Sequence, residues 1–221
     1  MKNAKIINLN VDDRVEKAIN NSMDIYLNKL KTGFIDIGLE DTFKMNLGVI
    51  IGRELEQMTF YKDERFIVKF ESNMPINGNN DYVDIVIEYQ RCGVQRLYLM
   101  ELKFKKITDS APDLGTVESF IDIYNLDSYH ATTPNVFGCY FIFLTNLKTY
   151  HNIPVRGTRT QLPMYDGAII TPHHAYTVTG SAAQNASSKY PTGFTFNGTY
   201  TIEYHNSLIN GDNYWHFILK I

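Results

Sequence analysis

Two apolar runs in the middle of the chain carry acidic residues at positions where a hydrophobic side chain is expected. The first run, 82–87, contains Asp84, and the second, 97–103, contains Glu101 and ends on Lys103. Alternate side chains of an extended strand point to the same face, so one face of the second run changes from apolar to ionic at its end. If the two runs pair about 4.8 Å apart, Asp84 and Glu101 direct oxygens to one point, with the ammonium of Lys103 beside them.

Two carboxylates at that separation repel each other unless a cation lies between them. Hard oxygen ligands of this kind suit Mg²⁺, for which Mn²⁺ can substitute. The pattern therefore predicts a divalent-metal site at Asp84 and Glu101. The alternative is a solvated strand end, where Asp, Glu and Lys are common. The position of Glu101 and Lys103 inside a strongly apolar run favours the metal site.

A third acid is predicted to point inward from a helix further upstream. In the segment 43–58, hydrophobic residues recur at the 3.6-residue period of a buried helical face; they are Leu47, Ile51, Leu55 and Met58. At about 100° per residue, Glu54 falls in the middle of this face and Glu56 points to the opposite side. A buried carboxylate needs a partner or a metal, so Glu54 is a candidate companion of the strand acids. The alternative is a salt bridge to Arg53 or Lys69.

The segment from Phe43 to about Asn146 resembles the core of the PD-(D/E)XK nuclease superfamily, the restriction-endonuclease-like fold. The resemblance rests on Glu54 in a helix, Asp84 in a strand, and Glu101-Leu102-Lys103 in the next strand. The expected order also agrees, with a helix, strands at 66–71, 82–89 and 96–104, a helix at 113–130 and a strand at 138–145. One departure is Val83, which precedes Asp84 where the family name has proline. That proline is often replaced in the family.

The resemblance implies an α/β fold with a mixed central sheet flanked by helices, and an enzyme that hydrolyses phosphodiester bonds with Mg²⁺. Asp84, Glu101 and the carbonyl of Leu102 would hold a cation that activates water and polarises the phosphate. Lys103 would orient the water or stabilise developing negative charge. Glu54 would help to hold a second ion or a metal-bound water.

The length of 221 residues suits one sizeable hydrophobic core. We therefore expect a single nuclease domain, 1–221, with its core at about 43–146 and an amphipathic helix at 12–31 that packs on this core or on a second subunit. Alternating patterns around Asn-Gly at 197–198 and 210–211 predict two β-hairpins. We expect them to form a β-rich C-terminal elaboration, a small antiparallel meander within about 150–221.

The formal net charge of −3 gives no overall attraction to nucleic acid, although local basicity in a cleft is sufficient for binding. Cys92 and Cys139 lack the spacing of a disulfide framework or a zinc site, so we expect them to be reduced. The sequence has no signal peptide and no run of 18 apolar residues. These features predict a cytoplasmic protein with no membrane association.

The segment 154–163 is dense in side chains that donate hydrogen bonds. It contains Arg156, Arg159 and Gln161; arginine can bind guanine and glutamine can bind adenine through two hydrogen bonds. We therefore expect this loop to read DNA bases, with an ordinary surface loop as the alternative. Weaker candidates for DNA contacts are His173, Lys189, and the phosphate-facing pair Lys105 and Lys106, which equally suit a solvated strand end.

The combined pattern predicts a type II restriction endonuclease that cuts double-stranded DNA at a specific sequence and acts as a homodimer. Two alternatives remain open. One is another nuclease of the same superfamily, such as a phage, repair or structure-specific enzyme. The other is a noncatalytic DNA-binding relative that kept the fold, although the intact set of Asp84, Glu101 and Lys103 argues against it.

Overall fold

The computed structural model describes residues 10–36, 38–74, 82–109, 111–178 and 193–221. The chain divides into two compact units. The first unit is Met1–Met100 with Thr133–Gly138, and the second unit is Glu101–Thr132 with Cys139–Ile221. Strands β3 (Val94–Lys105) and β4 (Val136–Thr145) therefore contribute residues to both units.

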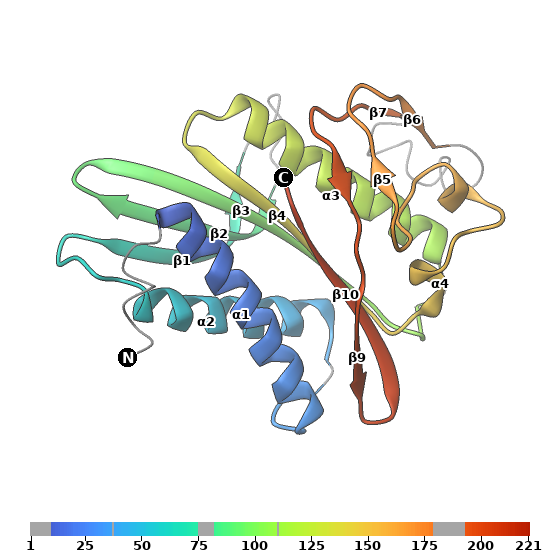
Figure 1. Ribbon diagram of the computed structural model, residues 1–221, viewed down its shortest axis with the longest axis horizontal. Helices are drawn as coiled ribbons and strands as arrows, with labels where there is room; N and C mark the ends of the chain where they lie inside the picture. The colour runs from blue at the N-terminus through green and yellow to red at the C-terminus, as the bar shows by residue number, and fades with distance from the viewer. Residues whose placement is uncertain (1–9, 37, 75–81, 110, 179–192) are drawn as a thin grey trace. The chain divides into compact units, whose positions relative to one another are not determined.

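Six strands are hydrogen-bonded in the order β1-β2-β3-β4-β10-β9 (Figure 1). Besides β3 and β4, the sheet contains β1 (Arg65–Asn73), β2 (Tyr82–Arg91), β9 (His205–Ile209) and β10 (Asp212–Lys220). The pairs β1–β2, β2–β3, β4–β10 and β10–β9 are antiparallel. Between β3 and β4, the N–H of Leu97 donates to Asn135 and the hydroxyl of Thr145 donates to the carbonyl of Lys105. These contacts advance along both strands together, so β3 and β4 are parallel and the sheet is mixed.

In the first unit, two helices precede the strands. They are α1 (Val11–Lys31) and α2 (Glu40–Gln57), and they confirm the helices expected at 12–31 and 43–58. The side chain of Asn10 accepts a hydrogen bond from the N–H of Asp13 at 2.8 Å, which caps the start of α1. The rings of Tyr26 in α1 and Phe43 in α2 lie 4.9 Å apart, so the two helices pack against each other.

Helix α2 also packs closely on the sheet of the first unit. A Cβ atom at Gly48 would collide with the ring of Phe70 in β1 and would press on Ile85 in β2. The absence of a side chain at Gly48 therefore sets how near this helix approaches the strands. Leu47, Ile51 and Leu55 lie on the same buried face, each with 0% exposure, which confirms the periodicity seen in the sequence.

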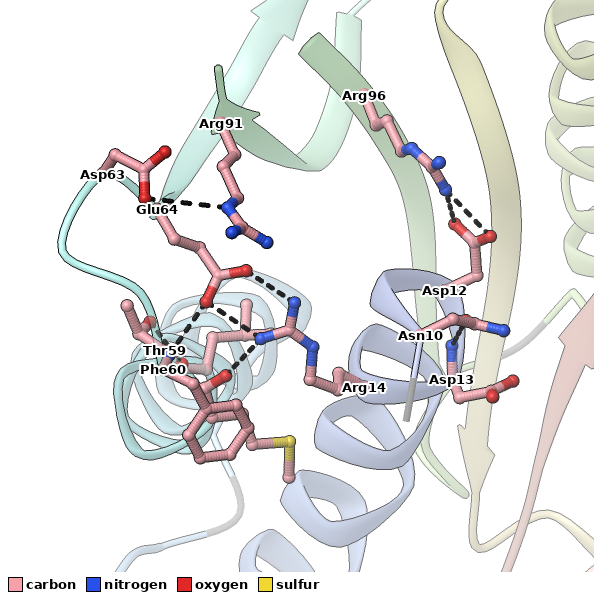
Figure 2. A network of polar contacts seen from close by, with 12 residues as sticks. Asn10, Asp12, Asp13, Arg14, Thr59, Phe60, Asp63, Glu64, Arg91 and Arg96 are labelled. Carbon is pink, nitrogen blue, oxygen red and sulfur yellow. Dashed lines mark hydrogen bonds and ion pairs between the residues drawn. The ribbon is translucent and has the colours of Figure 1, made fainter. Parts of the chain in front are cut away.

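A buried ion pair fastens α1 to the segment between α2 and β1 (Figure 2). The guanidinium of Arg14 donates to both carboxylate oxygens of Glu64, at 3.0 and 2.6 Å. The N–H of Phe60 donates to the same carboxylate at 2.9 Å. Burial acts to raise the pKa of Glu64, but the hydrogen bonds from Arg14 and Phe60 outweigh it and hold the pKa below its usual value.

The second unit is built around α3 (Pro112–Thr132) and the strands β4, β10 and β9. Helix α3 connects the parallel strands β3 and β4, as a crossover helix does. Further elements are α4 (Lys148–His151), the 3-10 helix η2 (Thr158–Thr160), and two pairs of very short strands. Those strands are β5 (Ile169–Ile170) with β8 (Tyr200–Thr201), and β6 (Tyr176–Thr177) with β7 (Gly193–Phe194).

One of the two expected hairpins is confirmed, but its place in the fold is not the expected one. Ile209 pairs with Asp212 across Asn210 and Gly211, both of which have positive φ, 52° and 91°. That is the backbone which a two-residue hairpin turn requires. Strand β10 of this hairpin pairs with β4, so the hairpin extends the six-stranded sheet instead of forming part of a separate meander.

The prediction of a hairpin around Asn197-Gly198 is wrong, because β7 pairs with β6 and β8 pairs with β5. The buried carboxylate of Asp127 in α3 gives the physical reason. It accepts hydrogen bonds from the backbone N–H of Asn197 at 2.9 Å, from its side chain at 2.8 Å, and from the hydroxyl of Tyr200. The Asn-Gly segment is thus anchored to the helix.

The structure is therefore a mixed α/β fold in which helices flank a six-stranded mixed sheet. From α2 to β4 the elements run helix, three strands, helix, strand, in the order expected from the sequence. In the part of the chain that the structure describes, no helix combines the length and the apolar character that a membrane span needs.

The ion pair in Figure 2 yields a stability prediction. Replacing Arg14 by alanine leaves the buried carboxylate of Glu64 without its cation, so we expect the free energy of unfolding to fall by about 3–5 kcal/mol. Arg53→Ala on the exposed side of α2 is the control, with an expected change within about 0.5 kcal/mol. Urea unfolding of both variants measures the difference, and equal losses would contradict a stabilising role for this pair.

Candidate functional site

The carboxylate of Asp84, near the start of β2, contacts a lysine that sequence reasoning did not select. The ammonium nitrogen of Lys44 in α2 lies 3.1 Å from Asp84 Oδ1 and 2.6 Å from Glu71 Oε1. Asp41 Oδ1 lies 3.4 Å from the same nitrogen. The side chain of Lys44 is only 8% exposed, and that of Asp84 is 21% exposed. Asp84 therefore belongs to a cluster of three acids around one lysine within the first unit.

The charge of Lys44 is stabilised by this cluster. Burial acts to lower the pKa of Lys44, but the hydrogen bond to Glu71 and the charge of Asp84 outweigh it and raise the pKa above its usual value. Lys44 is therefore a permanent cation at neutral pH. The sequence did contain a signal for it, because Lys44 precedes Leu47 by three residues and Ile51 by seven, which places it on the buried face of the helix.

Glu71 has an unusual backbone for its residue type. Its φ is 47°, in the left-handed region that residues with a side chain rarely adopt. The ladder between β1 and β2 continues on both sides of it, with Phe70 opposite Ile85 and Ser72 opposite Val83. By this register Glu71 is the β1 residue across from Asp84. Backbone strain of this kind is concentrated at functional sites.

Glu54 lies on the predicted side of α2, facing α1. It is half-buried and accepts a hydrogen bond from the side chain of Asn21 at 3.1 Å, whereas Glu56 is exposed. Lys69, which sequence reasoning considered as its partner, forms an ion pair with Glu88 instead. Glu54 follows Lys44 by ten residues in the same helix, or about 15 Å of helix length. Lys44 is thus the α2 residue that contacts Asp84.

In the second unit, the ionic end of β3 lies along α3. Glu101 is buried, with 8% exposure, and the adjacent Leu102 has 0% exposure. The ammonium of Lys103 lies 3.0 Å from Asp122 Oδ2, and both side chains are 17% exposed. Two residues further along, Lys105 lies 3.0 Å from Glu118 Oε2. Asp122 and Glu118 are one helical turn apart, so α3 supplies an acid for each of these lysines.

The candidate residues are thus divided between the two units. Asp84 and Glu54 belong to the first unit, and Glu101, Leu102 and Lys103 belong to the second. The described ladder between β2 and β3 ends at the pair Ile85 and Met100. Asp84 is the residue before Ile85, and Glu101 is the residue after Met100.

The donor chemistry of these residues fits a magnesium ion. Among the described residues, no group of three or more His, Cys, Asp and Glu side chains lies close enough together to hold a metal. Mg²⁺ does not need such a cage, because it is commonly bound by one or two carboxylates, waters and the phosphates of a substrate. The carboxylate of Asp84 already accommodates a cation, the ammonium of Lys44.

The two arginines of the 154–163 loop differ in their surroundings. Arg156 is exposed. The guanidinium of Arg159 donates to the carbonyls of Thr149 and Asn152 and lies 5.8 Å from the ring centre of Tyr150. Burial lowers the pKa of Arg159 from its usual value. Arg159 therefore ties the loop to α4, while Arg156 is accessible to a ligand.

The other residues proposed for DNA contacts differ in their exposure and in the partners of their side chains. Gln161 is exposed, and so is His173, which has a positive φ of 59°. Lys105 is engaged by Glu118. Lys106 is partly exposed, and its backbone N–H donates to Asp109 at 2.7 Å. Lys189 lies outside the described residues.

Comparison with known proteins adds no further assignment to this site. No family model, no curated protein and no solved structure matches the chain.

The contrast between the two loop arginines can be tested by stability. Arg159→Ala removes hydrogen bonds to backbone carbonyls and the packing of a half-buried side chain, so we expect the free energy of unfolding to fall by about 1–3 kcal/mol. Arg156→Ala should change it by less than about 0.5 kcal/mol. Denaturant unfolding of the two variants checks this, and an Arg159→Ala protein as stable as the wild type would show that Arg159 does not anchor the loop.

Proposed function

We propose that this chain is a magnesium-dependent DNA endonuclease in which Asp84, Glu101 and Lys103 carry out phosphodiester hydrolysis. The observation that carries the proposal is the ionic end of β3. Glu101 is buried beside a fully buried leucine, and Lys103 follows it at the next position on the same face. Burying a carboxylate in an apolar strand costs solvation energy. A bound divalent metal would compensate the negative charge.

Two further observations support the assignment. The order of elements from α2 to β4 agrees with the order in the nuclease core that the sequence resembles. Asp84 and Glu101 also each adjoin the last described pair of the β2–β3 ladder, Ile85 with Met100. Asp84 directly precedes Ile85 in the sequence, and Glu101 directly follows Met100.

The chemical roles follow from the side chains. A divalent ion held by Asp84, Glu101 and the carbonyl of Leu102 would supply Lewis acidity towards the phosphate and activate water for attack. Lys103 is a cation that can stabilise negative charge developing on the phosphoryl oxygens. Asp122, 3.0 Å from the Lys103 ammonium, orients that cation.

Within this class we propose a sequence-specific type II restriction enzyme that acts as a homodimer on double-stranded DNA. The support is the exposed, donor-rich pair Arg156 and Gln161 in the second unit, whose side chains can each make two hydrogen bonds to a purine. Discrete plasmid fragments would agree with this role. Smeared products or cleavage of branched DNA would indicate another nuclease of the superfamily, and binding without cleavage would indicate a noncatalytic relative.

Substitution of the proposed catalytic residues tests the function directly. Asp84→Asn, Glu101→Gln and Lys103→Ala should each reduce the cleavage rate by about 10²-fold or more, because each removes a group that acts on the transition state. The assay is plasmid cleavage with Mg²⁺, and circular dichroism verifies that each variant is folded. EDTA should abolish wild-type cleavage. Undiminished cleavage in EDTA, or by Lys103→Ala, would rule out this mechanism.

A second prediction separates the two glutamates of α2. If Glu54 assists the metal site, Glu54→Ala should slow cleavage at limiting Mg²⁺, whereas the exposed Glu56→Ala should leave the rate unchanged. Rates measured across a Mg²⁺ titration make the comparison. Equal rates in the two variants would assign Glu54 a purely structural role, namely its hydrogen bond to Asn21 of α1.

A further inference from the structure

The cluster around Lys44 has a feature that stability does not explain. Two of the three acids that contact Lys44 are largely exposed, with side-chain exposures of 65% for Glu71 and 84% for Asp41, whereas the side chain of Asp84 is 21% exposed and that of the lysine is 8% exposed. Exposed ion pairs contribute little to stability, and burying a lysine costs solvation energy. Placing the ammonium of Lys44 beside Asp84 from the buried face of α2 therefore costs solvation energy that the ion pairs recover only in small part.

A second lysine in the same unit provides the contrast. Lys69 of β1 also pairs with a glutamate, Glu88 of β2, but its side chain is 50% exposed. In that pair the carboxylate is the buried partner, and glutamine side chains at positions 90 and 95 donate to it as well. The Lys69 pair thus has an evident structural reason, which is to satisfy a buried carboxylate. In the pair of Lys44 with Glu71, the lysine is the buried partner and the carboxylate is the exposed one.

We propose that Lys44 is a built-in counter-ion of Asp84, held in position by Glu71, and that its ammonium competes with the divalent metal for the Asp84 carboxylate. This inference rests on the proposed function, since it takes Asp84 to be a metal ligand. It assigns Lys44 and Glu71 a regulatory role at that site.

The geometry explains how the competition operates. Two cations cannot share one carboxylate oxygen closely without strong repulsion, so a metal at Asp84 requires the ammonium to move away from Oδ1. Glu71 Oε1 at 2.6 Å and Asp41 Oδ1 at 3.4 Å are alternative partners for it. The lysine can therefore leave Asp84 without becoming unpaired.

Competition of this kind keeps the metal affinity of the free protein low. Bound DNA changes the balance, because its phosphates bring further oxygen ligands for the metal and negative charge for the ammonium. Metal binding at Asp84 is then coupled to substrate binding. The coupling protects the protein from holding a reactive metal site when no DNA is present.

The experiment measures Mn²⁺ binding to the full chain without DNA, by electron paramagnetic resonance of free Mn²⁺. Lys44→Gln removes the competing charge, and we expect it to bind Mn²⁺ about tenfold more tightly than the wild type, since a unit charge within about 4–6 Å changes a charge equilibrium by at least this much. Lys44→Arg keeps the charge and should bind Mn²⁺ like the wild type. The control Lys69→Gln removes a lysine that pairs elsewhere and should also leave the affinity unchanged.

Asp84→Asn identifies the site, because the binding that responds to Lys44 must be lost in it. Equal affinities of the wild type and Lys44→Gln, both lost in Asp84→Asn, would overturn the role of Lys44 and leave the nuclease proposal intact. Binding that is the same in the wild type, Lys44→Gln and Asp84→Asn would overturn the metal role of Asp84 itself, and with it both proposals.

A second variant keeps the inference testable if Lys44→Gln does not fold. Glu71 is largely exposed, so Glu71→Gln should fold, and it leaves Lys44 with Asp84 as its main partner. Its Mn²⁺ affinity should fall below that of the wild type. An unchanged or higher affinity would show that Glu71 is not the alternative partner that lets Lys44 leave Asp84, and would overturn the competition.

Discussion

Burying a charged side chain costs several kcal/mol unless an opposite charge or a set of hydrogen bonds compensates it, and this constraint organises both units of the protein. In the first unit it joins Arg14 to Glu64 and so ties the first helix to the segment before β1. In the second unit it joins Lys103 to Asp122 and so sets β3 against α3. The hydrophobic contacts supply most of the driving force for folding, but the pairing of charges decides which surfaces meet.

The same constraint separates structural acids from candidate functional ones. Glu64 and Asp127 are buried, and each accepts several hydrogen bonds that hold one segment of chain onto another. Asp84 is different, because its partner Lys44 is the buried member of the pair and Asp84 is partly accessible. A partly accessible acid whose charge is compensated by a buried lysine can still accept a second cation.

The proposed metal binding requires that the cation paired with the Asp84 carboxylate can be replaced by another cation. Backbone hydrogen bonds hold a carboxylate to donors that cannot move away. The ammonium of Lys44 is on a flexible side chain and can shift from Asp84 to Glu71. The left-handed backbone of Glu71 places this alternative partner across the ladder from Asp84. The strained backbone at Glu71 in β1 and the buried Lys44 in α2 thus both affect the carboxylate of Asp84.

The sequence by itself determined the long helices and strands from 11 to 145, because a 3.6-residue or two-residue period is a local property of the chain. It also determined which face of α2 is buried and the turn at Asn210-Gly211. Only the tertiary structure decided the partners: Lys44 for Asp84, Asn21 for Glu54, and Asp127 for the Asn197 segment that was expected to close a hairpin. Periodicity tells which way a side chain points, but the charge that meets it comes from a distant part of the chain, and its identity depends on how the elements pack.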